Sequence, residues 1–168
     1  MNRAFSIAVA IMLCVASMAA QEITIEYDEA VDFGTFKTFA IREGNVKSQS
    51  PALNSELTRK RMESEVERAL TARGLKNASA RPDLEVFFSL GSDPGTRTER
   101  YPTRWRGRGR AVKVPNMQGT LVIDIRHPST HDLVWRGVAT EDERNPAKLA
   151  EKLDDMVKKT IARYPPKK

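Results

Sequence analysis

Short segments with alternating or mainly apolar residues recur along the chain and predict the strands of a sheet. In the first segment, polar residues separate Ile23, Ile25 and Tyr27, so these three side chains share one face. Five such segments predict five strands, at residues 22–27, 36–41, 83–89, 119–126 and 133–140. Residues 44–54 are polar and contain Pro51, which predicts a loop after the second strand.

Two longer segments carry apolar residues at helical spacing. The first helix is expected from about Ser55 to Arg73. Asn54 or Ser55 can cap its N-terminus, and Gly74 suits the left-handed position beyond its C-terminus. The second helix begins after Asn145, a good N-cap that is followed by proline. Each helix therefore has an apolar stripe that it can bury against a sheet.

The order of these elements is strand, strand, helix, three strands and a final helix. This order predicts an α+β fold, with a mostly antiparallel sheet of about five strands and two helices packed on one face. The length of residues 21–168 fits a single domain. Residues 92–117 lie between two predicted strands and are expected to form a basic loop.

The last two strands are joined by residues 127–132, whose turn-rich composition predicts a hairpin. If Ile123 lies opposite Trp135, the apolar residues of both strands share the core face. Asp124 and Arg136 then fall on the other face as diagonal neighbours, within reach of a long side chain. We interpret them as a structural ion pair. The alternative is that Asp124 is a buried catalytic acid or base.

A family resemblance rests on several motifs in a fixed order. They are Tyr27-Asp28, Asp-Phe-Gly-Thr-Phe-Lys-Thr-Phe at residues 32–39, Pro-Asp-Leu-Glu-Val at 82–86, Gly-Thr-Leu-Val-Ile-Asp-Ile at 119–125 and Leu-Val-Trp-Arg-Gly at 133–137. With these motifs the chain resembles the bacterial domain of unknown function 4136. The resemblance implies an exported cell-envelope protein, in a family with many lipoproteins, and it implies no catalytic residues.

The first twenty residues have the features of a secretory signal peptide. Arg3 supplies a basic start, the stretch from Ala4 to Ala20 is uncharged and mostly apolar, and small residues stand at its end. We therefore expect an exported protein of the periplasm or the outer membrane. A retained membrane anchor is the alternative. Lipidation of Cys14 is disfavoured, because Leu13 precedes it where lipoproteins usually have a small residue.

The candidate chemistry of the mature chain is sparse. Removal of the signal removes the only cysteine, which excludes disulfides, thiol nucleophiles and thiolate metal sites. No nucleophile elbow, zinc-protease helix or phosphate loop is present, so we expect no catalytic residues, no cofactor and no metal. His127 and His131 are four residues apart, but Pro128 breaks the helix that would align them. Residues 141–143 are acidic and suit the positive N-terminal end of the following helix.

Positive charge is concentrated in one segment. The chain has a net charge of +6, and residues 93–113 carry seven cations against two carboxylates. The candidate anion-binding residues are Arg97, Arg100, Arg104, Trp105, Arg106, Arg108, Arg110 and Lys113. Export argues against nucleic acid, so anionic lipid, lipopolysaccharide or an acidic polymer is the expected partner class. The alternative is a solvated loop that keeps the protein soluble.

These observations favour a non-catalytic exported protein of the cell envelope, with a binding or scaffolding role toward an unidentified envelope partner. The first alternative is a binder of anionic envelope polymers or lipids through the basic segment. The second is an envelope hydrolase, which would require a paired acid and base in a pocket.

We predict that the mature protein starts at Ala20 or Gln21, because the small residues at the end of the apolar stretch suit signal cleavage there. N-terminal sequencing of exported material measures the start directly. A start at Met1 would indicate a retained anchor, and a lipid-modified start at Cys14 would indicate a lipoprotein.

Overall fold

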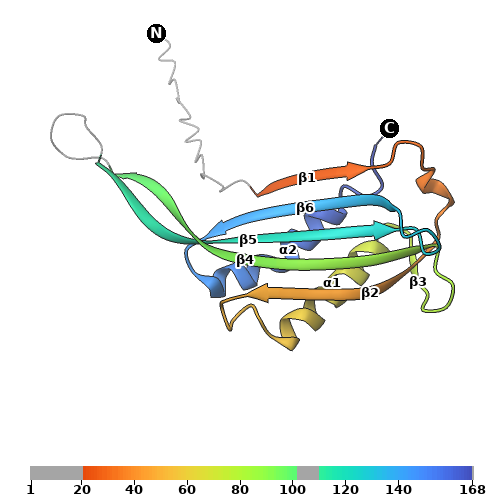
Figure 1. The fold of residues 1–168 in the computed structure, drawn as a ribbon, viewed down its shortest axis with the longest axis horizontal. Helices are drawn as coiled ribbons and strands as arrows, with labels where there is room; N and C mark the ends of the chain where they lie inside the picture. The colour runs from red at the N-terminus through yellow and green to blue at the C-terminus, as the bar shows by residue number, and fades with distance from the viewer. Residues whose placement is uncertain (1–20, 102–109, 168) are drawn as a thin grey trace, which may run out of the picture.

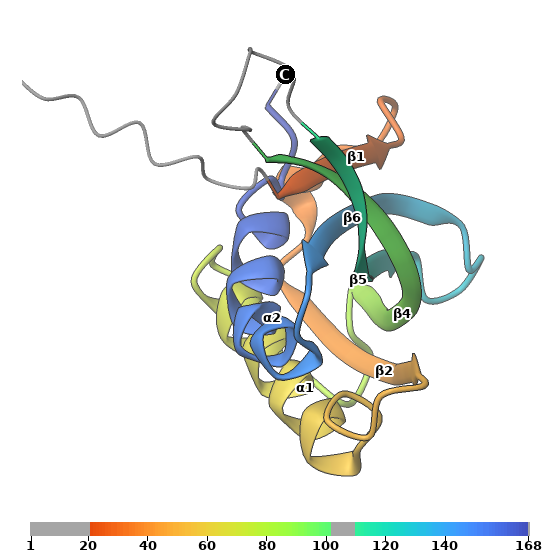
Figure 2. The same cartoon turned by 90° about the vertical axis from the view of Figure 1, so that its left-hand side faces the viewer.

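The computed structural model describes residues 21–101 and 110–167. They form one six-stranded sheet with two helices on the same face (Figures 1 and 2). The elements, in chain order, are β1 (Glu22–Tyr27), a 3₁₀ turn (Phe33–Thr35), β2 (Thr38–Ser48), α1 (Glu56–Thr71), β3 (Lys76–Asn77), β4 (Leu84–Tyr101), β5 (Arg110–Arg126), β6 (Leu133–Glu143) and α2 (Pro146–Ile161). The predicted α+β class with two helices is confirmed. None of the described helices has the length and apolar character needed to cross a membrane.

The sheet is mixed and not purely antiparallel. Its strand order is β1-β6-β5-β4-β2-β3, and β2 runs parallel to both β4 and β3, while the other pairs are antiparallel. Parallel neighbours need a crossover connection. Here α1 lies in the connection between β2 and β4, which places it against the sheet. The two-residue strand β3 was not predicted from the sequence, because so short a segment has no periodicity.

Asp83 fixes the start of the parallel pairing between β2 and β4. Its Oδ2 atom accepts hydrogen bonds from the backbone N–H groups of Lys37 at 2.8 Å and Thr38 at 2.9 Å. In return, the Asp83 backbone N–H donates to Thr38 Oγ1 at 2.9 Å. The backbone bond from Lys37 is the first cause of a pKa for Asp83 below its usual value. The carboxylate thus accepts the hydrogen bonds that backbone carbonyls of a neighbouring strand would otherwise accept, just before the first paired residues, Phe39 and Leu84.

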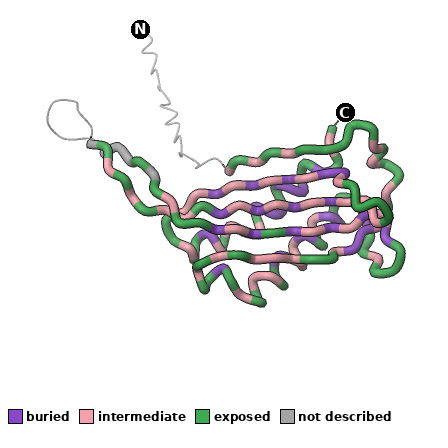
Figure 3. The backbone as a smooth tube through the Cα atoms, viewed as in Figure 1, coloured by how far each residue is buried: buried purple, intermediate pink, exposed green. Residues whose placement is uncertain are grey.

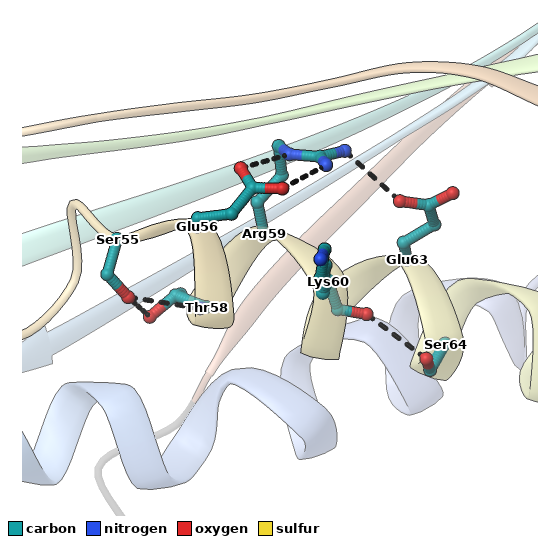
Figure 4. A network of polar contacts seen from close by, with 7 residues as sticks. All are labelled: Ser55, Glu56, Thr58, Arg59, Lys60, Glu63 and Ser64. Atoms are coloured by element: carbon teal, nitrogen blue, oxygen red, sulfur yellow. Dashed lines mark hydrogen bonds and ion pairs between the residues drawn. The ribbon is translucent and has the colours of Figure 1, made fainter.

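The helix ends follow the sequence prediction closely. Ser55 caps α1 by accepting a hydrogen bond from the Thr58 backbone N–H at 3.1 Å (Figure 4). Gly74 adopts a positive φ of 90° after the helix, as expected for a residue without a Cβ. Asn145 caps α2 by accepting from the Ala147 N–H at 2.9 Å. These local bonds satisfy donors that the first helical turn leaves without partners.

Charged side chains on the first turns of α1 reinforce the helix. Arg59 donates to Glu56 at 2.5 Å and to Glu63 at 3.1 Å, at the i−3 and i+4 positions of the helix (Figure 4). The hydrogen bond with Arg59 lowers the pKa of Glu56 from its usual value. Pairs at these spacings lie on one side of a helix, and here they leave the opposite side to the core.

The core lies between the helices and one face of the sheet. Buried and less buried positions alternate along the central strands, as a strand with a single covered face requires (Figure 3). The largest fully buried side chains are Trp135, Phe39, Leu53, Met62, Leu70, Leu84, Leu90, Leu121, Ile123, Ile125, Leu149 and Leu153. Trp135 is 0% exposed and packs edge-to-face on Tyr164, with ring centroids 5.7 Å apart. Burial raises the pKa of Tyr164 to about 12.

The predicted basic loop at 92–117 is wrong over most of its length, because β4 and β5 continue through it. They remain paired from Glu85 and Arg126 as far as Tyr101 and Arg110. β2 leaves β4 at Ser92, and β6 leaves β5 at Met117. Residues 93–101 and 110–116 therefore form a two-stranded ribbon that projects from the body (Figure 1). We call this ribbon the arm.

The arm escaped prediction for a physical reason. The alternation that signals a strand arises from burial of one face, and most described residues of the arm are exposed or only partly buried. The two strands of the arm are held together by the backbone hydrogen bonds between them instead. Pro94 and Pro115 also resemble loop residues in the sequence. Proline is tolerated where a strand edge is unpaired, and it discourages pairing with other chains there.

We predict that Trp135→Ala lowers the free energy of unfolding by about 3–5 kcal/mol, because it removes a fully buried aromatic side chain. Gly137→Ala should cost about 1–3 kcal/mol by overpacking. A Cβ at Gly137 would lie 2.4 Å from Trp135 Cη2 and from Thr160 Cγ2. Chemical denaturation measures both losses.

Gly91→Ala is the matched control, since it also lies in a strand but a Cβ there would have no heavy atom within 4 Å. It should leave the unfolding free energy nearly unchanged. Equal losses for Gly91→Ala and Gly137→Ala would contradict the packing described for Trp135.

Candidate functional site

We call the face of the sheet opposite the helices the open face. It carries a cluster of charged side chains at its centre. Asp124 on β5 accepts hydrogen bonds from Arg136 on β6, with Oδ1 2.6 Å from Nε and Oδ2 2.7 Å from Nη2. Arg126 Nη2 donates to the same Oδ2 at 3.2 Å. The Asp124 side chain is only 13% exposed. The predicted pair therefore forms as a bidentate interaction, which is the strongest geometry for an arginine and a carboxylate.

The strand register of this pair differs from the prediction. Asp124 lies directly opposite Arg136, and Ile125 lies opposite Trp135. The predicted register, with Ile123 opposite Trp135, would instead make the pair diagonal. A shift of two residues keeps each side chain on its own face, because strand side chains alternate with a period of two. The assignment of faces was therefore right although the register was wrong.

The two arginines keep Asp124 ionised. Burial alone would raise the pKa of the Asp124 carboxyl, but hydrogen bonds from Arg136 and Arg126 outweigh it and hold the pKa below its usual value. A general acid or base needs a pKa near the operating pH. An aspartate bound by two guanidinium groups is suited to a structural role instead.

A β-bulge in β2 directs two consecutive charged residues to the open face. The pairing with β4 shifts register between Ile41 and Glu43. Arg42 Nε donates to Glu85 Oε1 at 2.8 Å, and the next residue, Glu43, lines a hollow on the same face. A bulge allows this because its extra residue breaks the alternation of side chains. The predicted strand ends at residue 41, so the sequence pattern does not include Arg42 and Glu43 among the candidate residues.

A shallow hollow of about 200 Å³ lies beside the Asp124 cluster. Its lining residues are Glu43, Asn45, Phe87, Phe88, Ser89, Val122 and Asp124. Arg126 lies over the Phe87 ring, with Cζ 5.8 Å from the ring centroid. Within the described part of the chain, the side chains of Glu43, Asn45 and Ser89 have no hydrogen-bond or ion-pair partner. These three polar groups are therefore available to a ligand.

The arm carries part of the predicted anion-binding set. Arg97 and Arg100 lie on β4, where their backbones pair with Val114 and Ala111. Arg110 and the exposed Lys113 lie on β5. The remaining predicted residues, Arg104, Trp105, Arg106 and Arg108, lie outside the described residues. The structure thus places four of the eight candidate positions on one two-stranded element.

The other candidate groups have structural partners. Residues 141–143 belong to β6 and not to the loop before α2, and Lys152 on α2 donates to Glu141 and Glu143. This cross-element pairing replaces the predicted interaction with the helix N-terminus. The hydrogen bond from Lys152 is the largest cause of a lowered pKa at Glu143. His131 Nδ1 lies 3.7 Å from Glu85 Oε2. Within residues 21–101 and 110–167, no three His, Cys, Asp or Glu side chains are placed to hold a metal ion together.

Comparison with known proteins identifies a family and a shared fold. The family model "Domain of unknown function (DUF4136)" matches residues 23–166, which confirms the resemblance found in the sequence motifs. No curated protein matches the chain. A solved DUF4136 family protein from Bacteroides thetaiotaomicron has a TM-score of 0.56 and 13% identity, with 86% of this chain and 96% of that chain covered.

Two further solved structures share the fold. A PDZ domain protein from Parabacteroides distasonis has a TM-score of 0.61 and 19% identity, with coverage of 87% of this chain and 36% of that chain. This chain thus spans about a third of that protein's length. The PelC dodecamer from Paraburkholderia phytofirmans has a TM-score of 0.51 and 14% identity, with 85% and 96% covered. At such low identity these likenesses show the fold alone.

We predict that Arg136→Gln lowers the free energy of unfolding by about 1–3 kcal/mol at neutral pH, because a half-buried carboxylate loses its bidentate partner. The pKa of Asp124 is lower in the folded than in the unfolded protein. The pair therefore stabilises the fold above the unfolded pKa, and this contribution is lost as the pH falls through the folded pKa. The two proteins should therefore converge in stability as the pH falls below the usual pKa of an aspartate, about 3.9, and through the lower folded pKa.

Chemical denaturation at several pH values measures this convergence. Arg61→Gln is the control, since it breaks the exposed pair between Arg61 and Asp154 and should cost less than about 1 kcal/mol. A constant difference between Arg136→Gln and the unmodified protein across the acid range would contradict the assignment.

Proposed function

The chain belongs to the DUF4136 family, and we propose that it is a non-catalytic, exported protein of the cell envelope whose role is binding. The signal-like first twenty residues support the location. The lowered pKa of Asp124 supports a non-catalytic role. Its two arginine partners favour the ionised carboxylate, whereas a general acid or base must gain and lose a proton near the operating pH. The envelope hydrolase therefore gains no support from the open face.

The observation that carries the proposal is the arm. Its backbone is fixed by cross-strand pairing as far as Tyr101 and Arg110, yet it lies outside the helix-covered body (Figure 1). The arm adds little to the core, yet its two strands stay paired along their length. Such an ordered, projecting element is suited to contact a binding partner. The exposure of Lys113 agrees with such a contact.

We propose that the arm contacts anionic material of the envelope, such as phosphate-bearing lipid, lipopolysaccharide or an acidic polymer. The segment from Asp93 to Lys113 holds seven cations and two carboxylates. Six of the cations are arginines, whose planar guanidinium groups bind phosphate and carboxylate bidentately. A ribbon extended from the body brings its described cation positions, Arg97, Arg100, Arg110 and Lys113, close to a surface before the rest of the protein touches it. Nucleic acid is not the expected partner of an exported protein.

We predict that replacement of residues 97–110 by a short glycine bridge leaves the body folded. The strands that flank the arm keep their neighbours, because β4 pairs with β2 up to Ser92 and β5 pairs with β6 from Met117. The melting temperature should therefore change by only a few degrees. The deletion should abolish sedimentation with vesicles that contain phosphatidylglycerol and with lipopolysaccharide. Binding by the intact protein should weaken as salt rises, since exposed charges are screened within about 10 Å at 0.1 M.

A charge-matched pair of variants separates the arm from net charge. The arm variant replaces Arg97, Arg100, Arg110 and Lys113 by Gln. The control replaces Lys60, Lys76, Lys148 and Lys158 by Gln, four exposed lysines of the body. Binding should be lost only in the arm variant. Equal binding by both variants would contradict the proposal, as would unfolding of the deletion protein.

A further inference from the structure

We infer that the hollow on the open face is a binding site for one unit of an uncharged, hydroxyl-rich chain, which is a sugar residue of a neutral saccharide. The hollow is formed by the central parts of β2, β4 and β5 and does not include the arm. This inference therefore concerns a second ligand and is independent of the anionic partner proposed for the arm.

The electrostatics of the site favour a neutral ligand. Among the described residues, two carboxylates and no cationic side chain line the hollow. The lining carboxylate of Asp124 already has cationic partners, as does the carboxylate of Glu85, two residues before Phe87 on β4. Asp124 is bound by Arg136 and Arg126, and Glu85 by Arg42. The Glu43 carboxylate faces the site without a cation bound to it, so an anionic ligand would be repelled at close range.

The polar groups without partners match hydroxyl groups. Glu43 can only accept hydrogen bonds, whereas Asn45 and Ser89 can both donate and accept. A sugar hydroxyl also donates and accepts, so adjacent hydroxyls of one ring can satisfy this set. The bulge is what brings the Glu43 carboxylate to the hollow beside Asn45.

The apolar part of the lining suits the C–H groups of a sugar ring, which form an apolar surface beside the hydroxyl groups. Phe87 and Val122 offer apolar surface next to the three polar groups, a combination typical of small-ligand sites. Arg126 packs on the Phe87 ring and is itself held by Asp124, which restricts the ring before any ligand arrives. Such preorganisation reduces the entropy lost on binding.

The size of the hollow indicates one unit of a longer chain. Its volume of about 200 Å³ is below the roughly 300–1,000 Å³ of pockets that enclose whole drug-sized ligands. It is a depression on a sheet face and not an enclosed cavity, so a polymer can continue on either side of the bound unit.

Titration with three uncharged tetrasaccharides, namely chitotetraose, cellotetraose and maltotetraose, tests this inference by amide NMR and calorimetry. We expect saturable binding of at least one of them, with shift changes at residues 43–45, 87–89 and 122–124. Glu43→Gln combined with Asn45→Ala should weaken binding about tenfold or more, because it removes or weakens two hydrogen-bonding groups. Binding should not depend on salt.

Two control proteins make the result specific. Glu22→Gln with Thr24→Ala alters exposed residues of β1 away from the hollow and should bind like the unmodified protein. The arm-deleted protein should also keep saccharide binding, so that failure of the arm proposal leaves this inference testable. The inference is overturned if no tetrasaccharide binds saturably, or if Glu43→Gln with Asn45→Ala binds as tightly as the β1 control.

Discussion

The structure depends on one asymmetry, which is that helices cover only one face of the sheet. α1 and α2 bury their apolar stripes there, and Trp135 lies fully buried beneath them. Because side chains alternate along a strand, this burial determines which residues of every strand face the core. The opposite face is left to polar residues. The charged cluster, the hollow and the arm all consist mainly of residues that do not belong to the hydrophobic core.

The same asymmetry explains which parts of the fold could be predicted. Residues 119–126 and 133–140 alternate clearly because one face of each is buried, and the hairpin between them was predicted. The N-caps Ser55 and Asn145 were predicted because capping is a local property of the chain. The parallel pairing of β2 with β4 was not predicted. It involves a contact between Asp83 and the start of β2, and these residues lie far apart in the sequence without a pattern that links them.

The candidate site was predictable only in part. Asp124 and Arg136 were recognised as a pair from alternation, although their exact register depended on the turn that joins the strands. Glu43 and Asn45 are not predictable in this way, because both follow a bulge. Glu43 lies just beyond the predicted strand, and Asn45 lies in the polar segment 44–54 that predicts a loop. A bulge changes the face of a residue without leaving a periodic signal. The arm was missed for the related reason that a ribbon without a core face has no pattern to detect.

The position of β1 at the sheet edge has a consequence for how the chain folds. The partners of β1 lie on β6, from Glu22 opposite Thr140 to Tyr27 opposite Trp135, so each pair is separated by more than 100 residues. The hairpin of β5 and β6 closes over a short turn, whereas the pairing of β1 with β6 requires closure of a loop of more than 100 residues. Of the six strands of the sheet, β1 is synthesised first and its partner β6 last, so the sheet can be completed only after β6 has been made.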